Sequence, residues 1–170
     1  MDEFLIVDGY NIVNYWPMLK DIANESLEQA RIKLIDILQD YQGYMEIHVI
    51  LVFDAHLTNE NSESHEFYGN VEVVYTRKGE TADQYIERWV NDRGKIKMIR
   101  VATSDYLEQT TILSRGAIRM SARELVNEIN RAKEEIKREH LCKLRPKYNT
   151  LDYLVNSDIL KKLKKIRRQR

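Results

Sequence analysis

The sequence is poor in cysteine, proline and glycine. Its 170 residues include one cysteine, Cys142, so an internal disulfide and a metal site built from several cysteines are both excluded. Two prolines and six glycines beside 43% hydrophobic residues exclude a collagen-like or disordered chain. The composition therefore predicts a globular protein, and the length suits one domain with a short extension.

Long apolar runs are also missing. No stretch approaches the roughly 18–20 apolar residues that span a bilayer. Residues 1–4 lack the basic segment that begins a secretory signal, and the apolar run after them is short. We therefore expect a cytoplasmic protein with no membrane partner.

The whole chain has no net charge, but its two parts carry opposite net charges. Lys and Arg number 27, as do Asp and Glu. Residues 131–170 hold 14 Lys and Arg against 5 Asp and Glu, a net charge of +9, so residues 1–130 carry −9. We divide the chain into residues 1–145, a folded domain, and residues 146–170, a basic C-terminal helical extension.

The extension has Leu160, Leu163 and Ile166 at three-residue spacing among many basic residues, which is typical of an amphipathic helix. Such a helix can bind RNA phosphates, pack on the acidic body or lie on a membrane surface. We favour RNA, although most charged runs are solvated helix faces. The candidate RNA-binding residues of the extension are Lys161, Lys162, Lys164, Lys165, Arg167 and Arg168.

Apolar runs of strand length alternate with helical patterns. The strand-like runs are 4–7, 48–53, 71–75 and 98–102, with a weaker one at 117–119. Helices are expected after four capping residues, namely Ser26, Thr81, Ser104 and Ser121. Continuous apolar strands separated by helices predict an α/β fold with a parallel sheet. The polar stretch 57–70 is expected to be a loop.

Carboxylates stand where these strands end. Asp8, Asp54 and Asp105 follow three of the runs, and Asp83 lies in the first turn of a predicted helix. The carboxyl ends of parallel strands share one edge of the sheet, so these side chains should converge.

Converging like charges call for a neutralising cation. Mg²⁺ and Mn²⁺ prefer carboxylate oxygens and recruit substrate phosphates, so the pattern favours phosphodiester hydrolysis. The alternative is that each Asp is only a helix cap or a turn residue. The four histidines show no spacing typical of metal ligands, and we expect no small-molecule cofactor.

Five short motifs together resemble the YacP-like group of NYN domains, which are PIN-like nucleases. The resemblance runs in order through residues 8–11 (Asp-Gly-Tyr-Asn), 52–56, 80–83, 102–106 and 121–125. It implies a three-layer α/β sandwich with a mainly parallel sheet, and an endoribonuclease that uses Mg²⁺ or Mn²⁺ and cuts mRNA at the ribosome.

The resemblance also implies roles for single residues. Asp8, Asp83 and Asp105 match the metal-binding core, and Asp54 is a further acidic member. Asn11 and Ser104 match positions that polarise the attacking water or hold a carboxylate.

An acidic pocket repels RNA, so other residues must contact it. Tyr10 is a candidate for stacking on a base. The candidates for gripping phosphates are Arg77, Lys78, Arg115 and Arg119, although exposed basic side chains commonly serve solubility alone. The competing hypothesis is a non-catalytic module that binds RNA or the ribosome and has a structural acidic edge.

Overall fold

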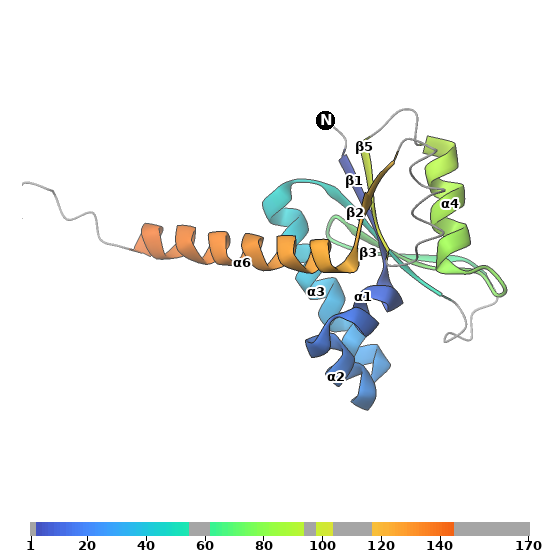
Figure 1. Cartoon of the computed structure of the whole chain (residues 1–170), viewed down its shortest axis with the longest axis horizontal. Coiled ribbons are helices and arrows are strands. Elements are labelled where there is room, and N and C mark those ends of the chain that lie inside the picture. The colour runs from blue at the N-terminus through green and yellow to red at the C-terminus, as the bar shows by residue number, and fades with distance from the viewer. Residues whose placement is uncertain (1–2, 55–61, 94–97, 104–116, 145–170) are drawn as a thin grey trace, which may run out of the picture. The chain divides into compact units, whose positions relative to one another are not determined.

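A computed structural model describes residues 3–54, 62–93, 98–103 and 117–144 (Figure 1). The elements in chain order are β1 (Glu3–Asp8), α1 (Gly9–Tyr15), α2 (Pro17–Glu25), α3 (Leu27–Met45), β2 (His48–Phe53), β3 (Ser64–Tyr68), β4 (Val71–Tyr75), α4 (Ala82–Arg93), β5 (Met98–Ala102), β6 (Ile118–Met120) and α6 (Ala122–Leu144). The chain forms two compact units, Met1–Glu135 and Ile136–Arg170. The sheet and helices α1 to α4 belong to the first unit.

The six strands form one sheet in the order β3-β4-β2-β1-β5-β6. All neighbours are parallel except β3, which runs antiparallel to β4. Asp8 pairs with Val52, and Phe53 pairs with Tyr75. The carboxyl ends of β1, β2 and β4 therefore meet at one edge of the sheet, which confirms the predicted α/β fold with its mainly parallel sheet.

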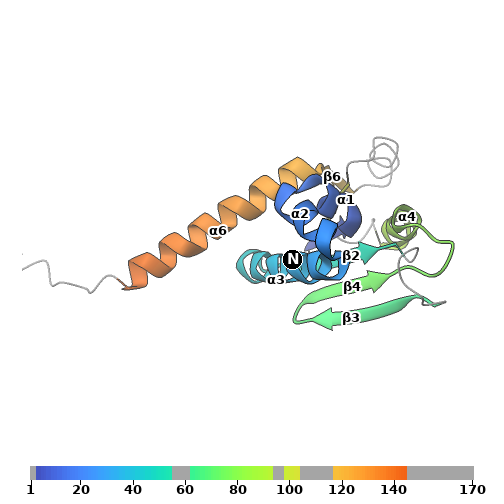
Figure 2. The same cartoon turned by 90° about the horizontal axis from the view of Figure 1, so that it is seen from below.

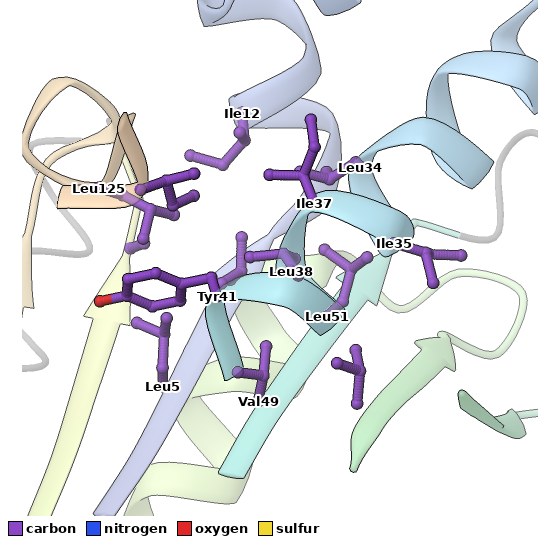
Figure 3. Packing of buried hydrophobic residues seen from close by; sticks show 14 of the residues in the cluster. Leu5, Ile12, Leu34, Ile35, Ile37, Leu38, Tyr41, Val49, Leu51 and Leu125 are labelled. Carbon is purple, nitrogen blue, oxygen red and sulfur yellow. The ribbon is translucent and has the colours of Figure 1, made fainter. Parts of the chain in front are cut away.

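Helices cover both faces of the sheet, because its strands are apolar on both sides. Leu5 and Val7 face a core shared with α1, α2, α3 and the start of α6, whereas Ile6 faces a second core built on α4. Figure 3 shows the first core, where Leu38 and Tyr41 of α3 lie over Leu5 and Leu51 of the sheet. Burying each such leucine contributes about 1.5–3 kcal/mol.

Three helices begin at the predicted caps. The Ser26 hydroxyl accepts from the backbone N–H of Gln29 at 3.3 Å. Thr81 and Gln84 cap each other's backbone N–H groups, and so do Ser121 and Glu124. These reciprocal bonds satisfy N–H groups that a helix start leaves without partners, and they confirm where α3, α4 and α6 begin.

One expectation about local structure was wrong, and two helices were not predicted. The expected loop at 57–70 contains strand β3, which forms a hairpin with β4 (Figure 2). Helices α1 and α2, at Gly9–Tyr15 and Pro17–Glu25, lie in a segment for which we predicted no helix. The weak strand at 117–119 exists as β6, at Ile118–Met120. The helix expected after Ser104 and the basic extension at 146–170 lie outside the described residues.

Within the described part of the chain, no helix is both long enough and apolar enough to cross a membrane.

Candidate active site at the carboxyl edge of the sheet

Asp8 joins the central strand β1 to helix α1. Its Oδ1 accepts a hydrogen bond from the backbone N–H of Asn11 at 3.1 Å, so the carboxylate caps the helix. Side chains alternate along a strand, and Ile6 faces α4. Asp8 therefore points to the α4 side of the sheet, with an orientation fixed by the backbone.

The surroundings of Asp8 disfavour its charged form. Burial raises the pKa of its carboxyl from 3.8 to about 6; the Asn11 N–H opposes this rise, and the negative charges of Asp83 and Asp54 add to it. The structure thus brings three of the sequence-predicted carboxylates within electrostatic reach of one another. Asp54 comes directly after β2, and Asp83 lies in the first turn of α4.

Asp54 adds an oxygen without a partner. Its Oδ1 is buried, and no described residue forms a hydrogen bond with it. A buried carboxylate oxygen is costly unless a donor or a cation satisfies it. Together with the raised pKa of Asp8, this oxygen indicates a place for a positive charge at this edge.

The donor set fits a hard divalent ion, because Asp8, Asp54 and Asp83 offer carboxylate oxygens alone. Among the described residues, however, no three His, Cys, Asp or Glu side chains lie close enough together to hold a metal ion. Two residues expected at this site, Asp105 and Ser104, lie outside the described residues.

Glu80 lies near the site but is bound elsewhere. Its carboxylate is buried and forms ion pairs with Arg88 at 3.1 Å and Arg77 at 3.3 Å. The Thr76 hydroxyl also donates to the Glu80 carbonyl at 2.7 Å. These contacts hold the segment between β4 and α4, and so they help to position Asp83 in the first turn of α4.

Tyr10 packs at the same edge of the sheet but on the face opposite α4. Its ring centroid lies 5.0 Å from that of Phe53, and its buried hydroxyl forms no hydrogen bond of good geometry with a described residue. Burial raises the pKa of Tyr10, while the positive charge of Arg31 holds it down and Asp54 adds a smaller upward shift. Arg31 was not among the sequence-predicted residues, because nothing in the pattern of α3 sets it apart from the exposed cations of the chain.

The predicted phosphate contacts are spread around this edge. Arg77 is 65% exposed despite its ion pair with Glu80, and Lys78 is exposed beside it. Arg119 is exposed on β6 at the end of the sheet. Arg115 and the six basic residues of the extension lie outside the described residues.

Comparisons with known sequences and structures identify the family of this chain. The model of the YacP-like NYN domain matches residues 5–168, nearly the whole chain. The chain belongs to the YacP-like NYN domain family. Its PIN-like fold indicates a nuclease, or a hydrolase in general, and nucleases of this kind generally depend on a divalent metal.

Relatives of this YacP-like chain come from Bacillus subtilis. The uncharacterized protein YacP of strain 168 is 40% identical over 167 residues, which cover 98% of this chain and 97% of YacP. The crystal structure of Rae1 (YacP) matches with a TM-score of 0.72 and 40% identity, over 99% of this chain and 95% of that one. A mutant of Rae1 matches with the same TM-score over 88% of each chain.

Proposed function

We propose that the chain is a Mg²⁺- or Mn²⁺-dependent endoribonuclease that cleaves mRNA associated with translating ribosomes in the cytoplasm. One observation carries this proposal: Asp8, held by the start of α1, lies among the charges of Asp54 and Asp83 with its pKa raised to about 6. The three neighbouring carboxylates favour binding of a divalent cation. The NYN family implies an RNA substrate, whose phosphates can also bind that cation.

The site residues have two roles in this proposal: some bind the metal, and others orient the metal ligands. Asp8 and Asp83 are the metal ligands that the described residues offer, with Asp105 as the third by family resemblance. When bound, the ion supplies an activated water as nucleophile and neutralises charge on the leaving oxygen. The Asn11 N–H keeps the Asp8 carboxylate in one orientation. Asp54 adds a negative charge and a buried Oδ1 for which the described residues provide no donor.

RNA is repelled by residues 1–130, which carry a net charge of −9. Exposed cations at the rim offset this repulsion, and Arg77, Lys78 and Arg119 lie on segments that flank the carboxyl edge. The +9 of residues 131–170 gives the chain a second basic region for ribosomal RNA. We propose that this region associates the chain with the ribosome, which presents the mRNA.

Cleavage of a labelled mRNA on translating ribosomes tests the proposal. We expect cleavage with Mg²⁺ or Mn²⁺ and none with EDTA. Asp8→Asn and Asp83→Asn should each lower the rate by at least about a hundredfold, because each removes a charged ligand. Asp40→Asn is the matched control, since Asp40 is exposed on α3 and lies outside the site.

Two results separate the proposal from its competitor. Full cleavage by a well-folded Asp8→Asn variant would show that the acidic edge is not catalytic. Ribosome binding without metal-dependent cleavage by the parent chain would establish the non-catalytic RNA-binding module instead. Free RNA alone is an insufficient substrate for this test, because the ribosome is part of the proposed complex.

A further inference from the structure

A cleft lies between helix α3 and the β3–β4 hairpin, on the face of the sheet opposite α4. Its volume is about 300 Å³, and we call it the α3–β4 cleft. Its walls include Arg31, Ile32 and Ile35 from α3, and Glu66, Tyr68 and Tyr75 from the hairpin. This volume lies at the lower end of the range for small-ligand sites.

The cleft begins at the proposed active edge. Tyr75 is the last residue of β4 and pairs with Phe53, which comes directly before Asp54. The rings of Phe53 and Tyr75 lie 5.8 Å apart with a 22° angle between their planes, and Tyr10 packs on the other side of Phe53. A row of three rings, Tyr10, Phe53 and Tyr75, therefore crosses the carboxyl ends of β1, β2 and β4 on the face opposite α4, and its last ring lines the cleft.

Arg31 provides a positive charge at the same place. Its guanidinium carbon lies 5.8 Å from the centroid of the Tyr75 ring, and its charge acts on the Tyr10 hydroxyl. Among the described residues, no carboxylate forms an ion pair with it. The guanidinium can therefore contact a phosphate or stack on a base.

The opposite wall combines an exposed ring with an acceptor. Tyr68 is 40% exposed, and its hydroxyl donates to the Glu66 carboxylate at 2.8 Å. On the α3 side, Ile32, at 46% exposure, gives the cleft an apolar surface. Two acids, Glu28 and Glu66, also line the cleft, so it suits the faces and N–H groups of a base better than a run of phosphates.

We propose that the α3–β4 cleft binds an unpaired base of the RNA strand beside the cleavage site. Tyr68 and Tyr75 provide ring surfaces for the base, Glu66 accepts from its N–H groups, and Arg31 holds the adjoining phosphate. Stacking of this kind tolerates any base, so the cleft anchors the strand without reading its sequence. The inference rests on the proposed endoribonuclease function.

Binding of a fluorescein-labelled oligouridylate of about ten nucleotides tests the cleft, a length within the site sizes of single-strand binders. All proteins carry Asp8→Asn, so that the RNA stays intact. We expect Arg31→Gln and Tyr68→Ala each to weaken binding about fivefold or more. Arg31→Gln should also reduce the slope of log affinity against log salt by about 0.7, the value for one phosphate contact on a single strand. Lys33→Gln is the matched control, since Lys33 is exposed on α3 and does not line the cleft.

Photocrosslinking provides a second readout. An oligonucleotide with 4-thiouridine should crosslink to the peptide that contains Tyr68 and Tyr75, and Arg31→Gln should reduce the yield. Affinities equal to that of Lys33→Gln, or crosslinks confined to other peptides, would overturn the cleft as an RNA site and leave this face for a protein partner. Thermal unfolding of each variant shows that it is folded; should Arg31→Gln fail to fold, the exposed Tyr68→Ala substitution decides.

The test separates the cleft from the function it rests on. If the parent chain cleaves mRNA but Arg31 and Tyr68 do not affect RNA affinity, the cleft proposal alone is wrong. If RNA binds in the cleft but no variant with intact acidic residues cleaves it, the cleft stands and the nuclease proposal fails.

Discussion

The ring of Phe53 occupies the space that a side chain at Gly9 would need. A Cβ atom on Gly9 would lie 2.6 Å from Cδ1 and 2.9 Å from Cζ of this ring, and closer still to Cε1. Phe53 is completely buried and ends β2, while Gly9 directly follows Asp8. Ring and backbone are therefore in close contact between the ends of β1 and β2, next to Asp8 and Asp54.

Gly9→Ala should lower both stability and activity. The ring is completely buried in the core, so the added methyl should reduce the free energy of unfolding by about 1–3 kcal/mol. It should also reduce cleavage, because the backbone next to Asp8 must shift. Gly43→Ala is the control: no atom lies within 4 Å of its Cβ position in α3, so we expect a gain of about 0.4–1 kcal/mol. Chemical denaturation of both variants checks the sign; equal effects would refute the steric argument.

Asp8 should make the metal-free protein less stable as the pH rises. Its pKa is about 6 in the folded protein and near 3.8 in the unfolded chain, so between these values the folded state binds more protons. The free energy of unfolding therefore falls as the pH rises from about 4 to about 6, by up to roughly 3 kcal/mol for this group. Asp8→Asn removes the charge, so in EDTA the free energy of unfolding of the variant should rise relative to that of the parent across this range.

Denaturation curves between pH 3.5 and 8 measure this difference. Addition of Mg²⁺ at pH 7 should raise the melting temperature of the parent and not that of Asp8→Asn, because only the parent keeps the ligand. Parallel pH profiles for the two proteins would show that burial and the neighbouring carboxylates do not raise the pKa of Asp8. Asp40→Asn should follow the parent throughout.

Arg88 and Arg77 both contact Glu80, but their loss should have different effects. Arg88 pairs with Glu80 and with Glu63, at 3.1 and 2.8 Å, whereas Arg77 is 65% exposed. Arg88→Ala leaves a buried carboxylate poorly compensated, so we expect a loss of about 1–3 kcal/mol. Arg77→Ala should cost less than about 1 kcal/mol and should weaken RNA binding instead.

A double-mutant cycle with Glu80→Gln checks the origin of this loss. Once Glu80 is neutral, Arg88→Ala should cost clearly less than in the parent, because no buried charge is left behind. An unchanged cost would place the contribution of Arg88 in its other contacts, which are the ion pair with Glu63 and the packing over the Tyr85 ring, whose centroid lies 4.9 Å away.

The strands that are buried on both faces were predictable from sequence. Runs 48–53, 71–75 and 98–102 coincide with β2, β4 and β5, because continuous β-branched and apolar residues suit a parallel sheet. β3 was missed since its side chains are polar or mostly exposed. A signal was nonetheless present: Gly69 and Asn70 form a two-residue connection, and Gly69 takes a φ of 61° that favours glycine.

Helices α1 and α2 show how tertiary contacts override local preference. α1 begins at a glycine and contains Val13, and neither favours a helix. Its helical form depends on the Asp8 cap and on Ile12 and Val13, which are buried against the sheet. α2 did carry a signal, because Pro17 occupies its first turn, where proline is well tolerated.

The convergence of carboxylates was predictable because it follows from topology, whereas the contacts of Arg31 were not. Asp8 and Asp54 end neighbouring parallel strands, so any such sheet brings them together. Arg31 meets Tyr10 and Tyr75 only through the packing of α3 against the sheet, which sequence periodicity does not determine in detail. The pairing of Glu80 with Arg88 was not predictable either, because it depends on the path of the segment before α4.

The basic extension should affect ribosome association more than chemistry. Replacement of Lys161, Lys162, Lys164 and Lys165 by Gln removes four of its charges in the full-length chain. If these residues bind ribosomal RNA, the variant should cosediment with ribosomes less well and with a weaker salt dependence, because fewer counterions are released. Cleavage at saturating ribosome concentration should be retained, since Asp8, Asp54 and Asp83 are unchanged. If the extension instead neutralises the acidic body, the substitutions should lower the melting temperature and leave the salt dependence of ribosome binding as it was.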